Sequence, residues 1–181
     1  MLARLVATAL VMLALATSAG ATAQKDNLQV FRDVQRQVLQ YPHFTIFDSV
    51  SAQVDNGTVT LVGKVTMPYK KNDIERRVAK LASVERLVNQ IEVLPVSQFD
   101  DDLRFRIARA IYSNPNFRPF ATMVNPPIHV IVDRGRVTLE GVVNSEVDRM
   151  LARSIATNFL AFDVKNALKT EAEVKVELEK L

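Results

Sequence analysis

Side chains that commonly carry acid–base or metal chemistry are few in this chain and are not grouped. Among its 181 residues there are two histidines, His43 and His129, and no cysteine. His129 alternates with Ile128 and Val130, so it belongs on the opposite face of a strand from them. The acidic run at residues 100–102 is interpreted as a helix N-terminus, where the helix dipole stabilises carboxylates. The sequence therefore predicts neither a metal site nor a cofactor.

Nucleophilic catalysis also lacks a recognisable set of residues. Ser83, Ser145 and Ser154 have no base or oxyanion partner at a familiar spacing, and no Gly-x-Ser-x-Gly motif occurs. The chain has five glycines, too few and too scattered for a loop that cradles phosphate groups. We therefore expect a protein that is not an enzyme and has no catalytic residues.

A stretch of aromatic, apolar and basic residues at positions 117–127 is the strongest candidate for binding. If it is exposed, its aromatic side chains can enter the headgroup boundary of a membrane while arginines contact phosphates. The alternative is that the aromatic residues pack under helices or seal a domain joint, as the matching Phe44 and Phe47 suggest. The candidate lipid-contact residues are Arg109, Phe117, Arg118, Phe120 and Met123.

Residues 1–23 have the pattern of a cleaved signal peptide. An apolar segment at 5–16 is followed by small residues and an Ala-x-Ala site at 21–23, which places cleavage before Gln24. Cleavage after Ala21 is an alternative. The apolar segment is shorter than the roughly 20 residues that a membrane-spanning helix needs. Without cysteine the chain cannot carry a lipoprotein acyl anchor or a disulfide, so we expect a soluble periplasmic protein.

Charge composition excludes one class of partner. The formal net charge of +3 is spread along the chain without a long basic run, whereas nucleic-acid binders concentrate positive charge on one face. Nucleic acid is therefore not expected as a partner. Mild positive charge is compatible with an anionic membrane surface. Oligomeric state is not predicted by the sequence.

The elements that would position these residues occur twice. The segment at 56–65, an Asn-Gly turn and a strand ending in a second glycine, recurs at 134–143 with Arg-Gly at the turn. Pro-x-Phe-x-x-Phe likewise occurs at 42–47 and 115–120, and the second copy then has extra residues within 121–127. Four glycines are assigned to turns and close backbone approach: Gly57, Gly63, Gly135 and Gly141.

Each copy is expected to follow the order α-β-β-α-β. In the first copy, apolar periodicity predicts a helix at 28–40 and a strand before the Asn-Gly turn. A second helix follows, capped by Thr66 with Pro68 in its first turn, and then a strand at 84–94.

In the second copy, helices begin near Asp100 and at Ser145, where Asp148 completes a pattern resembling a capping box. Val147 is assigned to the inward stripe of the second of these helices. The last strand is expected at 174–178, with an alternative start near Val164.

These elements predict an α+β fold of two tandem units. Each unit would be a small three-stranded mixed sheet with two helices packed on one face. The expected domains are residues 24–96 and 97–181. A unit of this size supplies only a few kcal/mol of stability from one core, so we expect the two units to pack on one another.

The hairpin at 56–65, the helix after it and the Val-x-x-Leu-Val-Asn strand at 84–89 resemble the BON domain. The resemblance covers nearly all of the mature chain, once per copy. The second copy departs from the pattern, because Arg134 replaces the turn asparagine and Asn166 matches Asn89 only after a one-residue shift. The cysteine-free chain also differs from the lipoprotein members of the family.

The resemblance implies a non-enzymatic periplasmic protein that binds phospholipid surfaces and supports envelope integrity, for example under osmotic stress. Two other functions are compatible with it. One is a protein-interaction or holdase-like role toward envelope proteins, and the other is association with the cell wall. The resemblance supplies no catalytic motif, so no catalytic residue is assigned from it.

Overall fold

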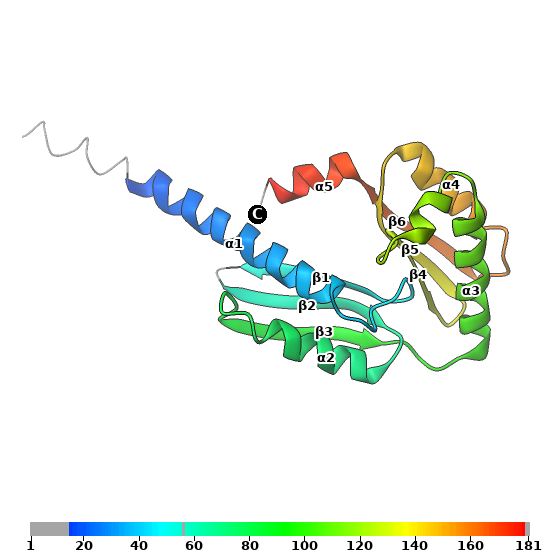
Figure 1. Ribbon diagram of the computed structural model, residues 1–181, viewed down its shortest axis with the longest axis horizontal. Coiled ribbons are helices and arrows are strands. Elements are labelled where there is room, and N and C mark those ends of the chain that lie inside the picture. Colours follow the sequence, from blue (N-terminus) through cyan, green and yellow to red (C-terminus); the bar gives the residue numbers. More distant parts are fainter. Residues whose placement is uncertain (1–14, 56, 180–181) are drawn as a thin grey trace, which may run out of the picture.

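The computed structural model describes the backbone of residues 15–55 and 57–179 and shows two α+β units in tandem (Figure 1). Each unit has a three-stranded mixed sheet with helices on one face, so the predicted fold class is confirmed. Residues 1–14 of the predicted signal peptide lie outside the described residues, as does Asn56 of the predicted turn. In the described part of the chain, no helix is both long enough and apolar enough to span a membrane.

The first unit contains five elements in the predicted order. They are α1 Leu15–Leu39, β1 Ser49–Asp55, β2 Thr58–Val65, α2 Pro68–Val78 and β3 Arg86–Val93. β2 lies in the centre of the sheet, antiparallel to β1 and parallel to β3. The connection from β2 to β3 runs through α2, because a parallel pair needs a crossover. α1 begins at Leu15 rather than at the expected residue 28.

The core of the first unit lies between its helices and one face of the sheet. Val59, Leu61 and Val65 of β2 are fully buried, because alternate side chains of a strand point to one face. Val34 from α1 and Ile74 from α2 pack against them. Each such side chain stabilises the fold by about 1.5–3 kcal/mol.

Thr66 does not cap α2, so that prediction is wrong. The N-cap residue is Met67, which makes no side-chain capping bond, and Pro68 occupies the start of the helix as expected. The Thr66 hydroxyl instead donates to Asp48 Oδ1 at 2.9 Å. Its oxygen accepts from Lys70 Nζ at 2.7 Å, and this charge-assisted bond takes the place of one from a helix N–H.

The second unit repeats the order and adds two short helices. Its elements are α3 Gln98–Ser113, the 3-10 helix η1 Arg118–Thr122, β4 Ile128–Asp133, β5 Arg136–Val143, α4 Glu146–Ala156, β6 Asp163–Thr170 and α5 Glu171–Leu178. β5 is the central strand, antiparallel to β4 and parallel to β6. Ser145 caps α4 by accepting a bond from Asp148 N, as predicted.

The buried face of α4 differs from the predicted stripe. Ala152 and Ala156 are fully buried, with Leu151 and Ile155 partly buried beside them. Val147 is 64% exposed, so its assignment to the core was wrong. At about 100° per residue, Val147 lies about 140° from Ala152 and about 180° from Ala156 around the helix, so it faces away from the buried side.

The last strand was predicted wrongly at residues 174–178, which form α5. The last strand is β6, which begins at Asp163 and so agrees with the alternative start near Val164. Thr170 and Glu173 form a complete capping box, in which each side chain accepts from the other residue's backbone N–H. Glu, Ala, Lys and Leu all favour helix, and these local signals outweigh the alternation of Val174, Val176 and Leu178.

Asn89 and Asn166 occupy equivalent positions despite the one-residue shift between the copies. Asn89 lies opposite Leu61 and Asn166 opposite Leu139, each on the central strand of its sheet. Each side-chain amide donates to a helix carbonyl, from Asn166 to Arg149 O at 2.8 Å. Each side-chain oxygen accepts a backbone N–H two residues later. Asparagine therefore ties the third strand of each unit to its crossover helix.

The strand glycines mark a close approach between neighbouring backbones. A Cβ at Gly63 would lie 2.1 Å from Ser49 O, and one at Gly141 would lie 1.9 Å from Pro127 O. Both residues have positive φ values, 134° and 119°. Only glycine combines this conformation with this separation, so both positions have a structural reason to lack a side chain.

The β4–β5 turn has a non-glycine residue in the left-handed region. Arg134 has a φ of 51° and is followed by Gly135 at 74°. The buried carboxylate of Asp100, from the first turn of α3, accepts both turn N–H groups, at 2.9 and 2.7 Å. These charge-assisted bonds offset the backbone strain that Arg134 introduces in place of asparagine.

Candidate functional site

The two units meet where the loop after α1 enters the second unit. Ile46 and Phe47 pack against the core of the second unit. Val130 N of β4 donates to Ile46 O at 2.8 Å, and the Phe47 ring meets Phe105 of α3 edge-on at 4.7 Å. The expected packing of one unit on the other is therefore present, and part of the matching Pro-x-Phe-x-x-Phe segment seals the joint.

Asp48 anchors this loop from inside the first unit. Its fully buried carboxylate accepts hydrogen bonds from Thr45, from Thr66 and from Lys70 Nζ at 2.6 Å. Burial alone would raise the pKa of Asp48, but the bonds from Lys70, Thr66 and Thr45 outweigh it and hold the pKa below its usual value. The loop is thereby fixed by an ionised carboxylate.

His129 of β4 contacts the same loop from the second unit. Its Nδ1 donates to the Asp48 carbonyl oxygen at 2.6 Å, and its ring lies 5.6 Å from that of Phe44. Burial lowers the pKa of His129, while Asp48 and Glu140 raise it by less. The ring therefore favours the neutral form and joins the two units as a structural group.

An ion pair joins the open faces of the two sheets. Lys64 Nζ lies 2.5 Å from Asp133 Oδ2 and 3.5 Å from Glu92 Oε2. The bond from Lys64 is the main cause that lowers the pKa of Asp133. Ser49 donates to Glu140 in the same region. Polar links of this kind orient the sheets, whereas the loop supplies the apolar contact.

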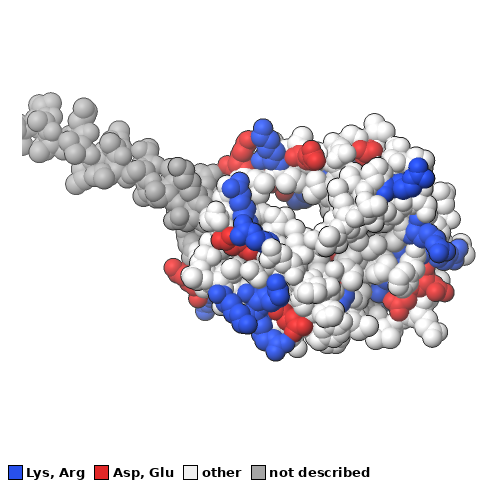
Figure 2. Space-filling view, in the orientation of Figure 1, with Lys and Arg blue, Asp and Glu red and all other residues white. Residues whose placement is uncertain are grey.

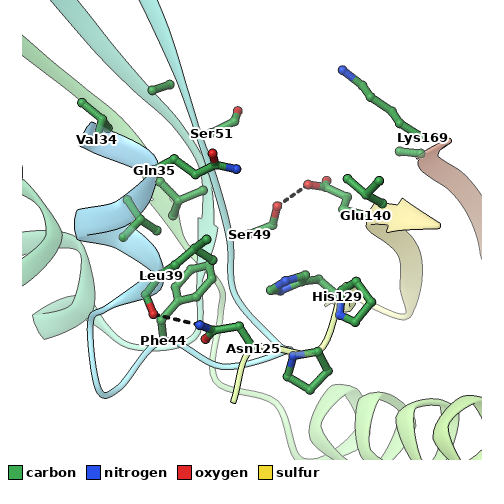
Figure 3. Close-up of a pocket in the computed structure, with 18 of the residues that line it drawn as sticks. Val34, Gln35, Leu39, Phe44, Ser49, Ser51, Asn125, His129, Glu140 and Lys169 are labelled. Carbon is green, nitrogen blue, oxygen red and sulfur yellow. Dashed lines mark hydrogen bonds between the residues drawn. The ribbon is translucent and has the colours of Figure 1, made fainter. Parts of the chain in front are cut away.

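A cleft of about 610 Å³ lies beside this joint, between the first and second units. α1, Phe44 and β1 form one wall, and residues 125–127 with β4, β5 and β6 form the other. Figure 3 shows Asn125 closing one end by donating to Leu39 O, 3.1 Å away. Gln35, Ser51 and Lys169 lie at the opposite end (Figure 3). The volume falls within the range of small-molecule sites.

The sequence-predicted lipid-contact residues are not all accessible. Arg109, Arg118 and Met123 are exposed, and Phe120 is partly buried against the core of the second unit. Phe117 is 0% exposed and belongs to that core. Phe117 therefore packs under the helices, which was the alternative to lipid contact. Any lipid contact in this region depends on Arg109, Arg118, Phe120 and Met123.

A more exposed apolar cluster lies at the opposite end of β4 and β5, around the turn at Gly135. Phe162 N donates to Gly135 O at 2.9 Å, and a Cβ at Gly135 would meet the rings of Phe162 and Phe99 at 2.6 and 3.4 Å. Phe162 is 82% exposed and Leu160, two residues earlier, is 87% exposed. Arg134 in the turn and Arg136 at the start of β5 are exposed as well, with Asp133 near both. We call these five residues the hairpin patch: Phe99, Arg134, Arg136, Leu160 and Phe162.

The hairpin patch was not predicted from the sequence. Its members come from a helix start, a turn and a loop, so no single periodic segment contains them. One signal was available, because Leu160 and Phe162 are large apolar residues between a predicted helix and strand.

In the described part of the chain, no group of three or more acidic, histidine or cysteine residues is arranged to hold a metal ion.

Charge is distributed without a dominant sign on the face shown in Figure 2. Basic and acidic side chains are interspersed there over both units. This face therefore offers no large basic surface to an anionic membrane.

Comparison with known proteins identifies the repeated unit. The family model of the BON domain matches residues 28–95 and again residues 99–172. No curated protein sequence matches the chain.

Two solved structures show low similarity to this chain. Both are of CdsD, a structural protein of the type III secretion system of Chlamydia trachomatis. One, its C-terminal domain, is 18% identical with a TM-score of 0.32, covering 82% of this chain and 68% of that one. The other is 14% identical with a TM-score of 0.28, covering 83% and 97%. Scores this low do not establish a shared arrangement of the two units.

Proposed function

The chain belongs to the BON-domain family, and from this membership and one exposed surface we propose that it binds phospholipid membrane surfaces peripherally. BON-domain proteins are generally non-enzymatic and are typically periplasmic or membrane-associated. The proposal includes export by the signal peptide at 1–23 and a role in envelope integrity or stress. Its partner would be the anionic phospholipid surface.

The hairpin patch is the observation that carries this proposal. Phe99 and Phe162 lie beside the turn at Gly135, Leu160 is two residues before Phe162, and all three are more than half exposed. Arg134 in the turn and Arg136 next to it are also exposed. Large apolar side chains beside basic ones suit the boundary between headgroups and acyl chains. Arg134 is held in place because Asp100 bonds the turn backbone. The patch therefore presents both kinds of contact from a rigid support.

Binding through this patch should be weak and sensitive to salt. Two arginines supply about 1 kcal/mol each near an anionic surface, and salt screens this attraction. Asp163 lies opposite Arg136 in the sheet register, which further limits the local positive charge. Apolar insertion of Leu160 and Phe162 must supply the rest of the affinity.

Co-sedimentation with vesicles tests the proposal. The chain is expected to sediment with phosphatidylglycerol-containing vesicles at low salt, much less at high salt, and little with phosphatidylcholine vesicles. Replacing Leu160 and Phe162 with Ser together should weaken binding by roughly tenfold, because two inserted side chains are lost. Val96→Ser is the matched control, since Val96 is 96% exposed in the linker.

The predicted loop provides the competing surface for the same function. Met123 is 51% exposed and its neighbour Val124 is 95% exposed, so Met123→Ser with Arg118→Gln tests that loop. If only this variant weakens binding, the loop rather than the hairpin patch meets the membrane. No sedimentation of the wild-type chain with anionic vesicles at low salt would refute phospholipid binding.

A further inference from the structure

The cleft between the units contains one carboxylate without a cationic partner. Glu140 accepts a hydrogen bond from Ser49, and in the described part of the chain no Lys, Arg or His lies within 4.0 Å of its carboxylate as an ion pair. His129 is its nearest basic neighbour in the cleft wall, and burial favours the neutral form of that ring. The nearby cations have other partners: Lys64 pairs with Asp133 and Glu92, and Lys169 pairs with Glu177 at 2.5 Å. Glu140 is thus a partly buried negative charge available to a ligand.

This charge distinguishes the second unit from the first. Glu140 precedes the strand glycine Gly141, and the matching position before Gly63 is Val62. Val62 lies on the open face of the first sheet, paired with Ser51 and Gln90. Glu140 lies on the equivalent face of the second sheet, where it lines the cleft beside Ala167. The packing of the repeat therefore does not require a carboxylate here.

The rest of the cleft is mainly apolar and includes aromatic rings. Phe31 and Phe44 belong to the wall from the first unit, and Pro126, Pro127 and Val142 belong to the wall from the second. Figure 3 shows Glu140 and Ser49 facing each other across the cleft, with His129 below them and Ser51 above. A negative group among apolar and aromatic surfaces attracts organic cations through ion pairing and cation–π contacts.

We propose that this cleft binds an organic cation with an apolar body, such as a linear alkylammonium. The ammonium pairs with Glu140 and donates to the Ser51 hydroxyl, while the alkyl chain lies against Phe31, Phe44 and Val142. A carboxylate in the same position would face Glu140 and be repelled, and a neutral head group would lose the ion pair. This site is separate from the hairpin patch and does not depend on membrane binding.

Calorimetric titration of the full chain without lipid tests the proposal. The probes are octylammonium, octanoate and octan-1-ol, which share a chain and differ in head-group charge. Octylammonium should bind saturably, one molecule per chain, and roughly tenfold more tightly than either other probe. Octanoate or octan-1-ol binding as tightly as octylammonium would overturn the proposal, as would no saturable octylammonium binding at millimolar concentration.

Two variants locate the site. Glu140→Gln keeps a hydrogen-bond acceptor for Ser49 but removes the charge, so octylammonium should bind roughly tenfold more weakly. Glu171→Gln, at an exposed carboxylate at the start of α5, is the matched control and should leave affinity unchanged. Ala167→Phe fills the cleft with Glu140 intact and should abolish binding. Far-UV circular dichroism verifies folding, and unchanged affinity in a folded Glu140→Gln or Ala167→Phe variant contradicts the assignment.

Discussion

Asp48 in the first unit and Asp100 in the second are both buried carboxylates, yet they stabilise opposite ends of the same fold. Asp48 lies at the joint, where it holds the loop after α1 against β2 and α2. Asp100 lies in the first turn of α3, at the opposite end of β4 from Ile128, where it holds the β4–β5 turn. In each unit, local donors compensate the buried carboxylate, and the segment held in place differs.

The partners of the two carboxylates explain why their substitution should differ. Asp48 neutralises Lys70, which is 4% exposed, so its removal leaves a buried charge unpaired. Asp100 accepts hydrogen bonds from the backbone N–H groups of Arg134 and Gly135, and the Arg134 side chain is exposed. Water can reach a loosened turn more easily than it can reach Lys70.

The largest expected effect is from Asp48→Ala. It should lower the free energy of unfolding by about 4 kcal/mol, because the Lys70 ammonium loses its buried partner. Urea unfolding measures this change. The double variant Asp48→Leu with Lys70→Met should recover much of the loss, since it removes both charges together. A single variant as stable as the wild type would mean that Lys70 reaches solvent.

Asp100→Ala should have a smaller effect, about 2 kcal/mol, from the loss of hydrogen bonds to the turn. Adding Arg134→Gly should restore part of it, because glycine adopts the left-handed conformation without strain. Asp102→Ala, an exposed residue of the same helix turn, is the control and should be nearly neutral. Equal losses from Asp100→Ala and Asp102→Ala in urea unfolding would show that helix-end charge, not the turn bonds, matters.

The smallest expected effect is a pH dependence at the joint. Because burial lowers the pKa of His129, the unfolded chain binds its proton more readily, and stability should fall as pH decreases below about 6.5. The fall ends below the folded-state pKa. Asp48 does not contribute in this window, because its lowered pKa keeps it ionised until stronger acid.

His129→Asn removes this titration while retaining a side-chain donor for the Asp48 carbonyl. The difference in unfolding free energy between about pH 7.5 and about pH 5.5 should therefore be smaller in the variant than in the wild type. His43→Asn is the control, because His43 is exposed in a loop of the first unit. Parallel pH profiles for wild type and His129→Asn would exclude His129 as the source.

Local patterns predicted most of the fold but failed where two signals competed. Strand alternation and the repeated glycines correctly placed β1, β2, β4 and β5. The alternating Val174, Val176 and Leu178 predicted a strand, but the Thr170–Glu173 capping box starts a helix there. Thr66 fits a capping pattern, yet a carboxylate 18 positions earlier takes its hydroxyl. A contact that distant in sequence has no local signature.

The candidate surfaces were harder to predict than the fold. The loop at 117–127 was identified from composition, but composition could not show that Phe117 is buried while Met123 is exposed. The hairpin patch joins Phe99 to Phe162 through Gly135, and the cleft joins Phe31 to Glu140. Each depends on segments from separate parts of the chain, so neither could be located from spacing.

The sequence by itself determined the duplication, the α-β-β-α-β order and the family, because these follow from short periodic patterns and from glycines that no other residue can replace. Only the tertiary structure decided how the two units meet. The links from Ile46 to Val130 and from Asp48 to His129 depend on how two finished units fit together. Docking is set by surface shape and by long-range polar contacts, which leave no periodic record in the chain.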